Sequence, residues 1–317
     1  MKIVHVDTSM QWRGGQRQLE LLTRGLAGRG HEQVLLCVPG SPVSRLGLPQ
    51  VRAYPGTDPR SALSLRKLEW DVLAAHTSHA HQVCVLAGAR PVVHRRVDFP
   101  VSGGFKYGRA LGYVCVSDAV RRILAGVVSE ERMVVVHDGV EPLSPMPPAE
   151  LGEGRIVLAV GALVDHKDHA TLDEAARGLD ARVLVAGEGP LDDHSHLELL
   201  GQRDDVAALF ARADVFVHPS KEEGLGQVVV EALHAGVPVV ATTAGGLPEV
   251  LAGVGLLVPP EDPDALRTAL RGALAGAHPP IEAGRARARE FSVEAMVEGT
   301  ERAYRHFAER PCAIIHE

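Results

Sequence analysis

The stretch that decides the fold is His218-Pro-Ser-Lys-Glu-Glu-Gly-Leu-Gly-Gln-Val-Val-Val-Glu-Ala-Leu-His-Ala-Gly-Val-Pro-Val-Val240. We expect a buried strand to end at His218 and a helix to run from Gly226 to Ala235, with glycines making the tight turn between them. The free amides at such a helix start suit a phosphate. Valines 228 to 230 also favour a strand. From residue chemistry alone, a plain alternative has the same weight as a functional role. In this alternative, Glu223 caps a helix and Glu231 is a solvated residue on a helix surface.

Short apolar runs alternate with stretches of helical period along the rest of the chain. Apolar runs without polar alternation are typical of parallel strands whose two faces are both covered. This βαβ order predicts an α/β fold. The expected strands are Ile3–Val6, Val34–Val38, Val72–Ala75, Pro91–Val93, Tyr113–Val116, Val134–Val136, Ile156–Val160, Arg182–Ala186, Val215–His218, Val237–Ala241 and Gly255–Val258. Further helices are expected over Gln16–Ala27, Asp168–Arg177, Val206–Ala213, Leu247–Leu251, Asp264–Ala273 and Ser292–Ala308.

The length of 317 residues suits two domains, each large enough to bury its own core. A proline-rich stretch without sustained period separates two regions of strand-helix alternation. We therefore predict two Rossmann-like doubly wound parallel-sheet domains that face a cleft with their strand carboxyl ends. The predicted boundaries are residues 1–143 for the first domain, 144–154 for the linker, 155–291 for the second domain and 292–317 for a C-terminal helix.

Composition excludes several classes of function. The net charge of −7 gives no global basic field for nucleic acid or anionic lipid, and the hydrophobic content of 45% excludes a disordered chain. The cysteines at 37, 84, 115 and 312 have no CxxC spacing, so neither a disulfide scaffold nor a zinc ribbon is expected. No export signal or uncharged membrane-length run is present in the sequence, which indicates a cytoplasmic protein.

Glu223 and Glu231, separated by seven residues and followed by Ala-Leu-x-Ala-Gly-Val-Pro-Val-Val, resemble the E-x7-E signature of the retaining glycosyltransferases of family 4. An ordered series of further motifs supports the resemblance, and such proteins have the GT-B architecture and use sugar nucleotides. The supporting stretches are Trp12-Arg-Gly-Gly-Gln, Val116-Ser117, Val136-His-Asp-Gly-Val-Glu141, Ala159-Val-Gly-Ala-Leu-Val-Asp-His-Lys167, Ala186-Gly-Glu-Gly-Pro190, Thr243-Ala-Gly-Gly-Leu-Pro-Glu249 and Leu257-Val-Pro-Pro-Glu-Asp-Pro263.

The resemblance implies an acceptor-side first domain, a donor-binding second domain, and a C-terminal helix that crosses back to the first. It makes Glu231 a ligand of the nucleotide ribose and Glu223 a contact of the transferred sugar. Lys167 would neutralise the leaving diphosphate, although a surface lysine is the plain alternative. The remaining donor-binding residues implied are Gly14, Gly15, Gly161, Gly187, Gly224, Leu225 and Gly226.

Two positions depart from the family pattern. Ala162 replaces the arginine that often follows the first donor-domain glycine, so a second cation on the diphosphate is missing or comes from Arg13 or Lys221. The family's histidine near the reacting sugar is represented by His94, although an ungapped match places Val97 there. The alternative for His94 is a histidine at a strand end.

Residues of two other stretches are candidates for the acceptor side. Histidines 76, 79 and 81 invite a zinc hypothesis, but we prefer no metal and assign Thr77, Ser78 and His79 to the acceptor side. Lys106 is a further acceptor-side candidate, and a solvated lysine is its alternative. A basic set offers a peripheral contact with the inner membrane face, or a solvated surface: Arg95, Arg96, Lys106, Arg109, Arg121 and Arg122.

The prediction that follows is a retaining glycosyltransferase that moves a sugar from a nucleotide-diphosphate donor to a hydroxyl acceptor in cell-envelope glycan, lipopolysaccharide or glycolipid synthesis. No cofactor and no metal are expected, because a lysine and helix-end amides supply the positive charge. Two alternatives stay open: a sugar-nucleotide epimerase of the same architecture, and a non-catalytic nucleotide-sugar binder.

Overall fold

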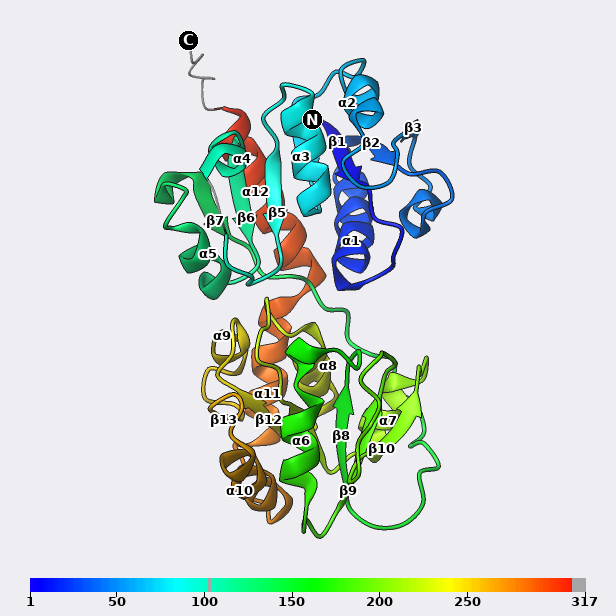
Figure 1. The fold of residues 1–317 in the computed structure, drawn as a ribbon, viewed down its shortest axis with the longest axis vertical. Helices are drawn as coiled ribbons and strands as arrows, with labels where there is room; N and C mark the ends of the chain where they lie inside the picture. Colours follow the sequence, from blue (N-terminus) through cyan, green and yellow to red (C-terminus); the bar gives the residue numbers. More distant parts are fainter. Residues whose placement is uncertain (102–103, 310–317) are drawn as a thin grey trace. The chain divides into compact units, whose positions relative to one another are not determined.

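The computed structural model describes residues 1–101 and 104–309, so Cys312 lies outside the described residues. The chain forms two compact units (Figure 1). Unit 1 comprises Met1–Gly139 and the C-terminal segment that begins at Val293, and unit 2 comprises Val140–Ser292. An N-terminal segment and the helix that begins at Val293 therefore both contribute to unit 1.

Unit 1 is built on a seven-stranded parallel sheet with the order β3-β2-β1-β4-β5-β6-β7. Its strands are β1 (Lys2–Asp7), β2 (Glu32–Cys37), β3 (Gln50–Arg52), β4 (Val72–Ala75), β5 (Val92–Arg95), β6 (Gly112–Cys115) and β7 (Met133–Val135). Its helices are α1 (Gly14–Gly28), α2 (Pro59–Leu65), α3 (Ser78–Leu86), α4 (Gly104–Gly108), α5 (Asp118–Leu124) and α12 (Val293–Ala308).

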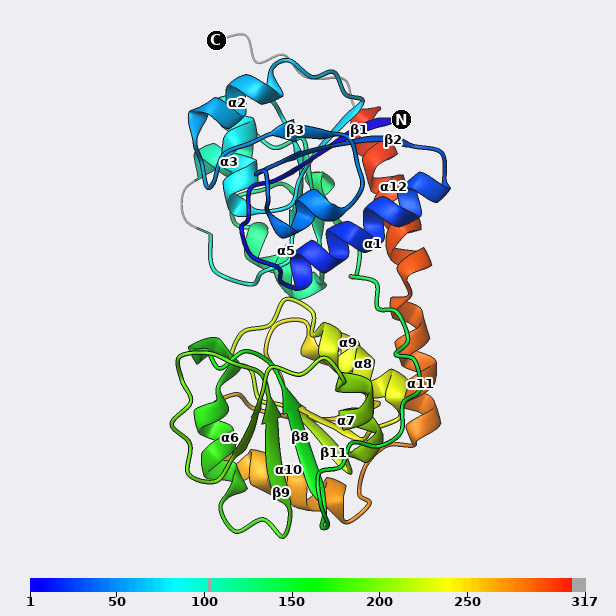
Figure 2. The same ribbon diagram turned by 90° about the vertical axis from the view of Figure 1, so that its right-hand side faces the viewer.

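Helices α1 and α12 pack together on one face of this sheet (Figure 2). Leucines of α1 and the aromatic residues Tyr304 and Phe307 of α12 cover the apolar residues that the strands present on that face. The Phe307 ring lies so close to the backbone of Gly112 in β6 that a Cβ there would approach it to 2.3 Å. The last helix is thus a part of the core of unit 1.

Unit 2 is built on a six-stranded parallel sheet with the order β10-β9-β8-β11-β12-β13. Its strands are β8 (Ile156–Val160), β9 (Arg182–Ala186), β10 (Glu198–Gly201), β11 (Val215–His218), β12 (Val239–Thr242) and β13 (Leu256–Val258). Its helices are α6 (His169–Ala176), α7 (Val206–Arg212), α8 (Gln227–Ala235), α9 (Leu247–Leu251), α10 (Pro263–Leu274) and α11 (Ile281–Ala288).

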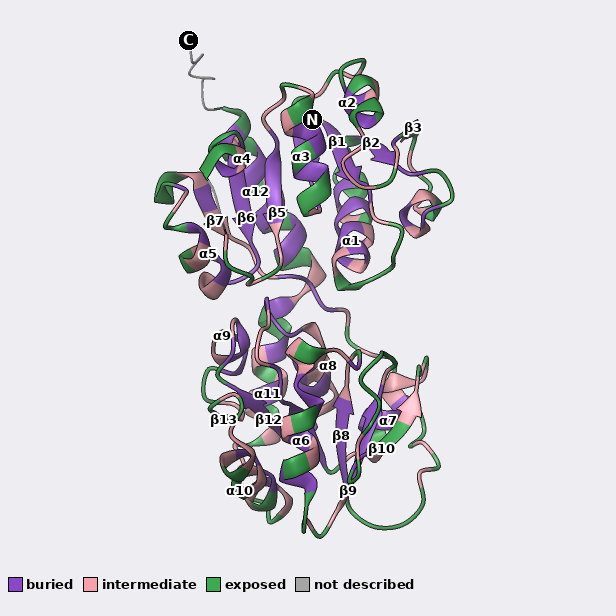
Figure 3. Cartoon of the chain, in the orientation of Figure 1, coloured by how far each residue is buried: buried purple, intermediate pink, exposed green. Residues whose placement is uncertain are grey.

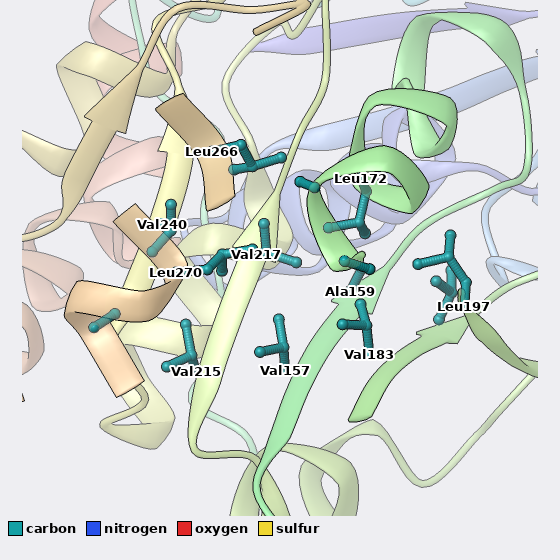
Figure 4. Close-up of a cluster of buried hydrophobic side chains, with 14 of the residues drawn as sticks. Val157, Ala159, Leu172, Val183, Leu197, Val215, Val217, Val240, Leu266 and Leu270 are labelled. Carbon is teal, nitrogen blue, oxygen red and sulfur yellow. The ribbon is translucent and has the colours of Figure 1, made fainter. Parts of the chain in front are cut away.

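The core of unit 2 lies between its sheet and helices α6 and α10 (Figure 4). Leu172 of α6 and Leu270 of α10 are both fully buried against Val157 and Val215 of the central strands. In Figure 3 these strands are coloured as buried, because helices cover both faces of the sheet. Burial on both faces explains why their sequences are apolar without alternation.

The predicted α/β class with two doubly wound parallel sheets is confirmed. The prediction omitted short elements, among them β3, β10, α2, α5 and α11. It also treated the stretch around His76–His81 as a loop, whereas α3 begins at Ser78. Within the described residues, no helix combines the length and the apolar composition that a membrane span requires.

Candidate active site

The strand order of unit 2 reverses direction between its two central strands. β8 pairs with β9 on one side and with β11 on the other, and β11 continues to β12. In open parallel sheets, ligands bind outside the carboxyl ends of strands at such a switch point. Lys167 lies in the connection that follows β8, and Glu223 lies in the connection that follows β11. Lys167 and Glu223, two of the three predicted catalytic residues, therefore reach the same position from two strands.

Lys167 and Glu223 form an ion pair. The Lys167 Nζ atom lies 2.5 Å from Glu223 Oε2, and the two side chains are 21% and 15% exposed. His218 Nε2 lies 2.7 Å from the same oxygen. Burial alone would raise the pKa of the Glu223 carboxyl, but Lys167 and His218 outweigh burial and hold that pKa well below its ordinary range. Glu223 is thus a carboxylate at neutral pH.

A short 3-10 turn, Asp165–Lys167, presents Lys167. The next residue, Asp168, has a left-handed backbone (φ 51°) and caps α6 by accepting from the Thr171 amide at 3.4 Å. Lys221 donates to Asp165 at 3.1 Å and lies 4.0 Å from Glu261. Lys221 is thus paired with a residue of this turn. To act as the predicted second cation on the diphosphate, Lys221 has to break its ion pair with Asp165.

The glycine turn before α8 is tightly packed. Gly224, Leu225 and Gly226 are buried. Gly226 has a backbone φ of 94°, and a Cβ atom placed on it would lie 2.7 Å from the Leu247 side chain. Only glycine fits there without strain. The amide of Gly246 donates to the Glu223 carbonyl oxygen at 3.0 Å, which fixes the loop against the start of α9.

Helix α8 begins where the sequence predicts, despite its run of valines. Gly226 occupies the N-cap position and has no side chain to cap the first amides. Glu231 lies one turn into the helix and is partly buried. The tertiary packing of Val229 and Val230, both fully buried, overrides their strand propensity.

A pocket opens beside this site at the carboxyl ends of β8 and β9. Gly161 and Gly187, both predicted to bind the donor, line it together with Ala162. Polar groups come from Glu188, which belongs to the Ala186–Pro190 motif, and from Gln202 and Arg203, which the sequence analysis did not single out. Arg203 is held by Asp205 at 2.6 and 2.7 Å. The pocket therefore has both hydrogen-bond donors and acceptors in its lining.

In unit 1, the predicted donor-binding glycines Gly14 and Gly15 open helix α1. The loop before them is held by Asp7, which is fully buried and accepts from Ser9 N at 2.7 Å and Gln16 Nε2 at 2.9 Å. No heavy atom lies within 4 Å of a Cβ placed on Gly15. Contact of these glycines with a donor stays a prediction.

His94 lies in a buried polar network of unit 1. Its Nε2 atom is 2.7 Å from the Tyr304 hydroxyl and its ring stacks on His76 at 4.5 Å. Arg96 donates to His94 Nδ1 at 3.3 Å and to Asp138 at 2.8 Å. Burial, and then the charge of Arg96, hold the pKa of His94 well below its ordinary value. This environment favours the structural alternative, and a role of His94 at the reacting sugar stays a prediction.

The acceptor-side candidates occupy the start of α3. Thr77 is the N-cap and accepts from the Ala80 amide at 3.0 Å, and Lys106 donates to Ser78 Oγ at 2.8 Å. His79 is exposed. Burial, and then Arg95, lower the pKa of Lys106. The structure thus brings Ser78 and Lys106 together.

The zinc hypothesis for histidines 76, 79 and 81 has no support. Helix α3 separates the ring of His79, which is exposed, from the buried ring of His81, and His76 lies outside the helix. Within residues 1–101 and 104–309, no three histidine, cysteine or acidic side chains are arranged to hold a metal ion.

Sequence reasoning missed His218, Ser220 and Thr242. His218 is 2% exposed and Ser220 is fully buried, and Ser220 Oγ lies 3.1 Å from His218 Nε2. The Thr242 hydroxyl donates to the Ser220 carbonyl oxygen at 2.6 Å. The available signal was that His218 and Ser220 lie a few positions before Glu223 in the sequence, and only the folded loop shows that His218 contacts both.

Comparison with known proteins agrees with this arrangement. The family model described as glycosyl transferases group 1 matches residues 154–275. A phosphatidyl-myo-inositol mannosyltransferase of Mycolicibacterium smegmatis is 29% identical over 314 residues, covering 82% of this chain and 81% of that protein. An uncharacterized glycosyltransferase of Methanocaldococcus jannaschii is 31% identical over 168 residues, covering 49% of this chain. The chain spans 47% of the length of that archaeal protein and 34% of the Arabidopsis thaliana sulfoquinovosyl transferase.

Solved structures share the fold. Anabaena HepE in complex with UDP and glucose superposes with a TM-score of 0.80 at 19% identity, covering 95% of this chain and 98% of that one. A glycosyltransferase from Rickettsia africae gives a TM-score of 0.81 at 19% identity, with 98% and 99% covered.

The chain therefore shares the two-domain fold of these solved structures, one of which is a glycosyltransferase. More narrowly, residues 154–275 form a glycosyltransferase group 1 domain within unit 2. This match agrees with the predicted enzyme class.

Proposed function

We propose that the protein is a retaining glycosyltransferase that moves a sugar from a nucleotide-diphosphate donor to a hydroxyl acceptor. The observation that carries this proposal is the Lys167–Glu223 pair at the switch point of unit 2. In this pair, a cation that suits a diphosphate lies next to an anion that suits sugar hydroxyls. Helix α8, whose N-cap is Gly226, begins nearby.

The donor is proposed to lie along the carboxyl edge of the unit 2 sheet. Its diphosphate contacts Lys167 and the first amides of α8, and Glu231 binds the ribose. The base is proposed to enter the pocket beside Gly161 and Gly187, whose lining includes the polar residues Gln202 and Arg203. Relatives support this class of donor, since HepE has been solved with UDP-glucose.

The proposed reaction needs no nucleophile from the protein. The bond between the anomeric carbon and the diphosphate oxygen breaks while the acceptor oxygen approaches the same face of the sugar. The acceptor proton passes to the departing phosphate oxygen, and Lys167 stabilises the charge that develops there. Glu223, a carboxylate held by two donors, orients the sugar in this proposal.

The acceptor is proposed to approach Ser78, His79 and Lys106 in unit 1, with Thr77 fixing the start of their helix. The class proposed is a cell-envelope glycan or glycolipid hydroxyl, in line with the phosphatidyl-myo-inositol mannosyltransferases among the relatives. The exposed Phe105, with Arg109 stacked on it at 4.3 Å, supports a peripheral contact with a lipid surface.

A donor screen followed by a turnover assay tests the proposal. UDP-, GDP- and ADP-sugars are compared by thermal shift, because a ligand that binds only the folded protein raises its melting temperature. The best donor is then incubated with and without a panel of alcohol acceptors. A glycosylated acceptor of unchanged anomeric configuration supports the proposal. A new sugar epimer formed without acceptor indicates an epimerase, and binding without any turnover indicates a non-catalytic binder.

A further inference from the structure

We propose that His218 is a positioning residue for Glu223: it donates a hydrogen bond from Nε2 to Glu223 Oε2 and keeps this carboxylate aimed at the sugar when Lys167 turns to the donor diphosphate. This inference rests on the proposed function. It adds a residue that does not touch the donor and acts only through Glu223.

The protein fixes the His218 ring from several sides. Its backbone belongs to β11, where it pairs in register with Ala241 of β12. The ring stacks on Phe216 at 6.2 Å with an angle of 28° between the planes, and the residue is 2% exposed. Ser220 Oγ lies 3.1 Å from Nε2, and the Thr242 hydroxyl holds the Ser220 carbonyl. A ring packed in this way does not follow a mobile side chain.

The partners of His218 determine its protonation pattern. Glu223 is a carboxylate and can only accept hydrogen bonds. The 2.7 Å separation between His218 Nε2 and Glu223 Oε2 therefore requires the proton on Nε2. Burial lowers the pKa of His218 below its ordinary value even with Glu223 beside it, so the ring is neutral at neutral pH. His218 thus acts as a neutral donor of fixed direction.

The two donors on Glu223 Oε2 differ in mobility. Lys167 has a flexible stem and is 21% exposed, whereas the side chain of His218 is 3% exposed. A diphosphate attracts an ammonium group more strongly than a single carboxylate does, because it carries more charge. When Lys167 turns to the donor, His218 keeps its bond to Oε2, and the carboxylate stays oriented for the sugar.

The test compares binding of a nucleotide sugar with binding of the nucleoside diphosphate that lacks the sugar. The probes are UDP-glucose with UDP, or GDP-mannose with GDP, whichever pair stabilises the wild type. His218→Leu removes the donor at similar volume. Calorimetry is expected to show about tenfold weaker nucleotide-sugar binding, because a hydrogen bond to a charged group is lost. Binding of the nucleoside diphosphate is expected to stay within twofold.

His218→Gln is the conservative variant, because its side-chain amide can donate from the position of Nε2. It is expected to restore most of the nucleotide-sugar affinity. His278→Gln is the matched control, since His278 is a partly buried histidine of unit 2 bonded to the Pro279 carbonyl, away from this loop. It is expected to behave as wild type.

A double-mutant cycle with Glu223→Gln distinguishes positioning from general support of the fold. If His218 acts through Glu223, adding His218→Leu to Glu223→Gln weakens binding no further. Additive losses overturn the proposal, and so does weaker binding of both probes by His218→Leu in a folded protein. If His218→Leu fails to fold, His218→Asn takes its place in the cycle, because its shorter side-chain amide does not reach Glu223 Oε2 from the position of Nε2. A wild type that binds no nucleotide sugar refutes the proposed function itself, which is a different outcome.

Discussion

The Lys167 ammonium and the Glu223 carboxylate lie 2.5 Å apart, so each is the ionic partner of the other. Lys167 is the proposed partner of the diphosphate and Glu223 that of the sugar. Donor binding therefore has to exchange one ion pair for two new contacts. The cost of separating Lys167 from Glu223 reduces the affinity for a nucleoside diphosphate, and the sugar contact compensates for it in the full donor.

The first prediction concerns Glu223→Gln. This change removes the charge that competes for Lys167, so we expect severalfold tighter binding of the nucleoside diphosphate. Sugar transfer is expected to fall by at least tenfold, because the neutral amide orients the sugar hydroxyls less strongly. Calorimetry and single-turnover assays measure the two effects. Weaker binding of the nucleoside diphosphate would show that the ion pair does not compete with it.

The second prediction separates the roles of Lys167 and Glu231. Lys167→Ala is expected to slow transfer about 100-fold, because charge on the leaving diphosphate loses its cation. Glu231→Ala is expected to weaken nucleotide binding about tenfold while kcat changes less, because the ribose contact is present before and during the reaction. Measured kcat and KM for both variants test this, and equal effects on both constants in both variants would contradict the assignment.

The third prediction concerns the turn before α8. Gly226→Ala places a Cβ 2.7 Å from Leu247 at a backbone φ of 94°. We expect a loss of about 1–3 kcal/mol in the free energy of unfolding, together with weaker donor binding. Gly253→Ala is the control, because Gly253 has a similar φ of 88° but no heavy atom within 4 Å of its Cβ position. Urea unfolding of both variants separates the backbone strain, which they share, from the contact with Leu247.

The fourth prediction concerns stability at acid pH. Burial is the main cause that lowers the pKa of His5, His81 and His169 to about 4 from the ordinary 6.5. The unfolded chain then binds more protons than the folded one between these values, so stability is full above about pH 6.5 and falls as pH drops toward 4. At pH 5 each histidine is expected to cost about 1–2 kcal/mol.

Urea unfolding at pH 7.5 and pH 5 measures this loss. His81→Gln keeps a polar side chain but cannot titrate, so its loss between the two pH values is expected to be smaller than that of the wild type. His79→Gln, which changes an exposed histidine of the same helix, is the matched control. An equal loss in His81→Gln and wild type would argue against this source of acid sensitivity.

The fifth prediction concerns metal ions. Because Lys167 and the helix-end amides supply the positive charge in the proposed mechanism, turnover is expected to persist in excess EDTA. Complete loss of activity with EDTA, followed by rescue with manganese, would refute this prediction. The variant Ala162→Arg complements the experiment: it restores the cation of the family pattern beside Gly161 and is expected to increase donor affinity severalfold.

Much of the fold follows from local pattern. Runs such as Ile156–Val160 have no polar alternation, and helices such as α10 have a clear apolar stripe, so both were predictable. The three-residue edge strand β3 carries the polar Gln50 and Arg52, which leaves no periodic signal. No helix was predicted for the histidine-rich stretch in which α3 begins. Its N-cap, Thr77, is nevertheless a residue type that commonly caps helices.

The site was predictable in its residues but not in its contacts. The spacing of Glu223 and Glu231 and the position of Lys167 were enough to predict the proposed donor site from sequence. That Lys167 pairs with Glu223, 56 residues away, depends on the order of β8 and β11 in the sheet, which no local pattern encodes. The bond between His94 and Tyr304 joins residues 210 positions apart and exists only because α12 returns to unit 1.

The position of α12 has a consequence for synthesis of the protein on the ribosome. Unit 2 is continuous in sequence and is complete once Ser292 has emerged, whereas the sheet of unit 1 emerges first and still lacks the helix that carries Tyr304 and Phe307. The apolar surface that these rings cover stays open to solvent while some 150 further residues are translated. Unit 1 is thus the first unit to be synthesised and the last to be completed, and a nascent chain exposes apolar surface to chaperones and proteases mainly in unit 1.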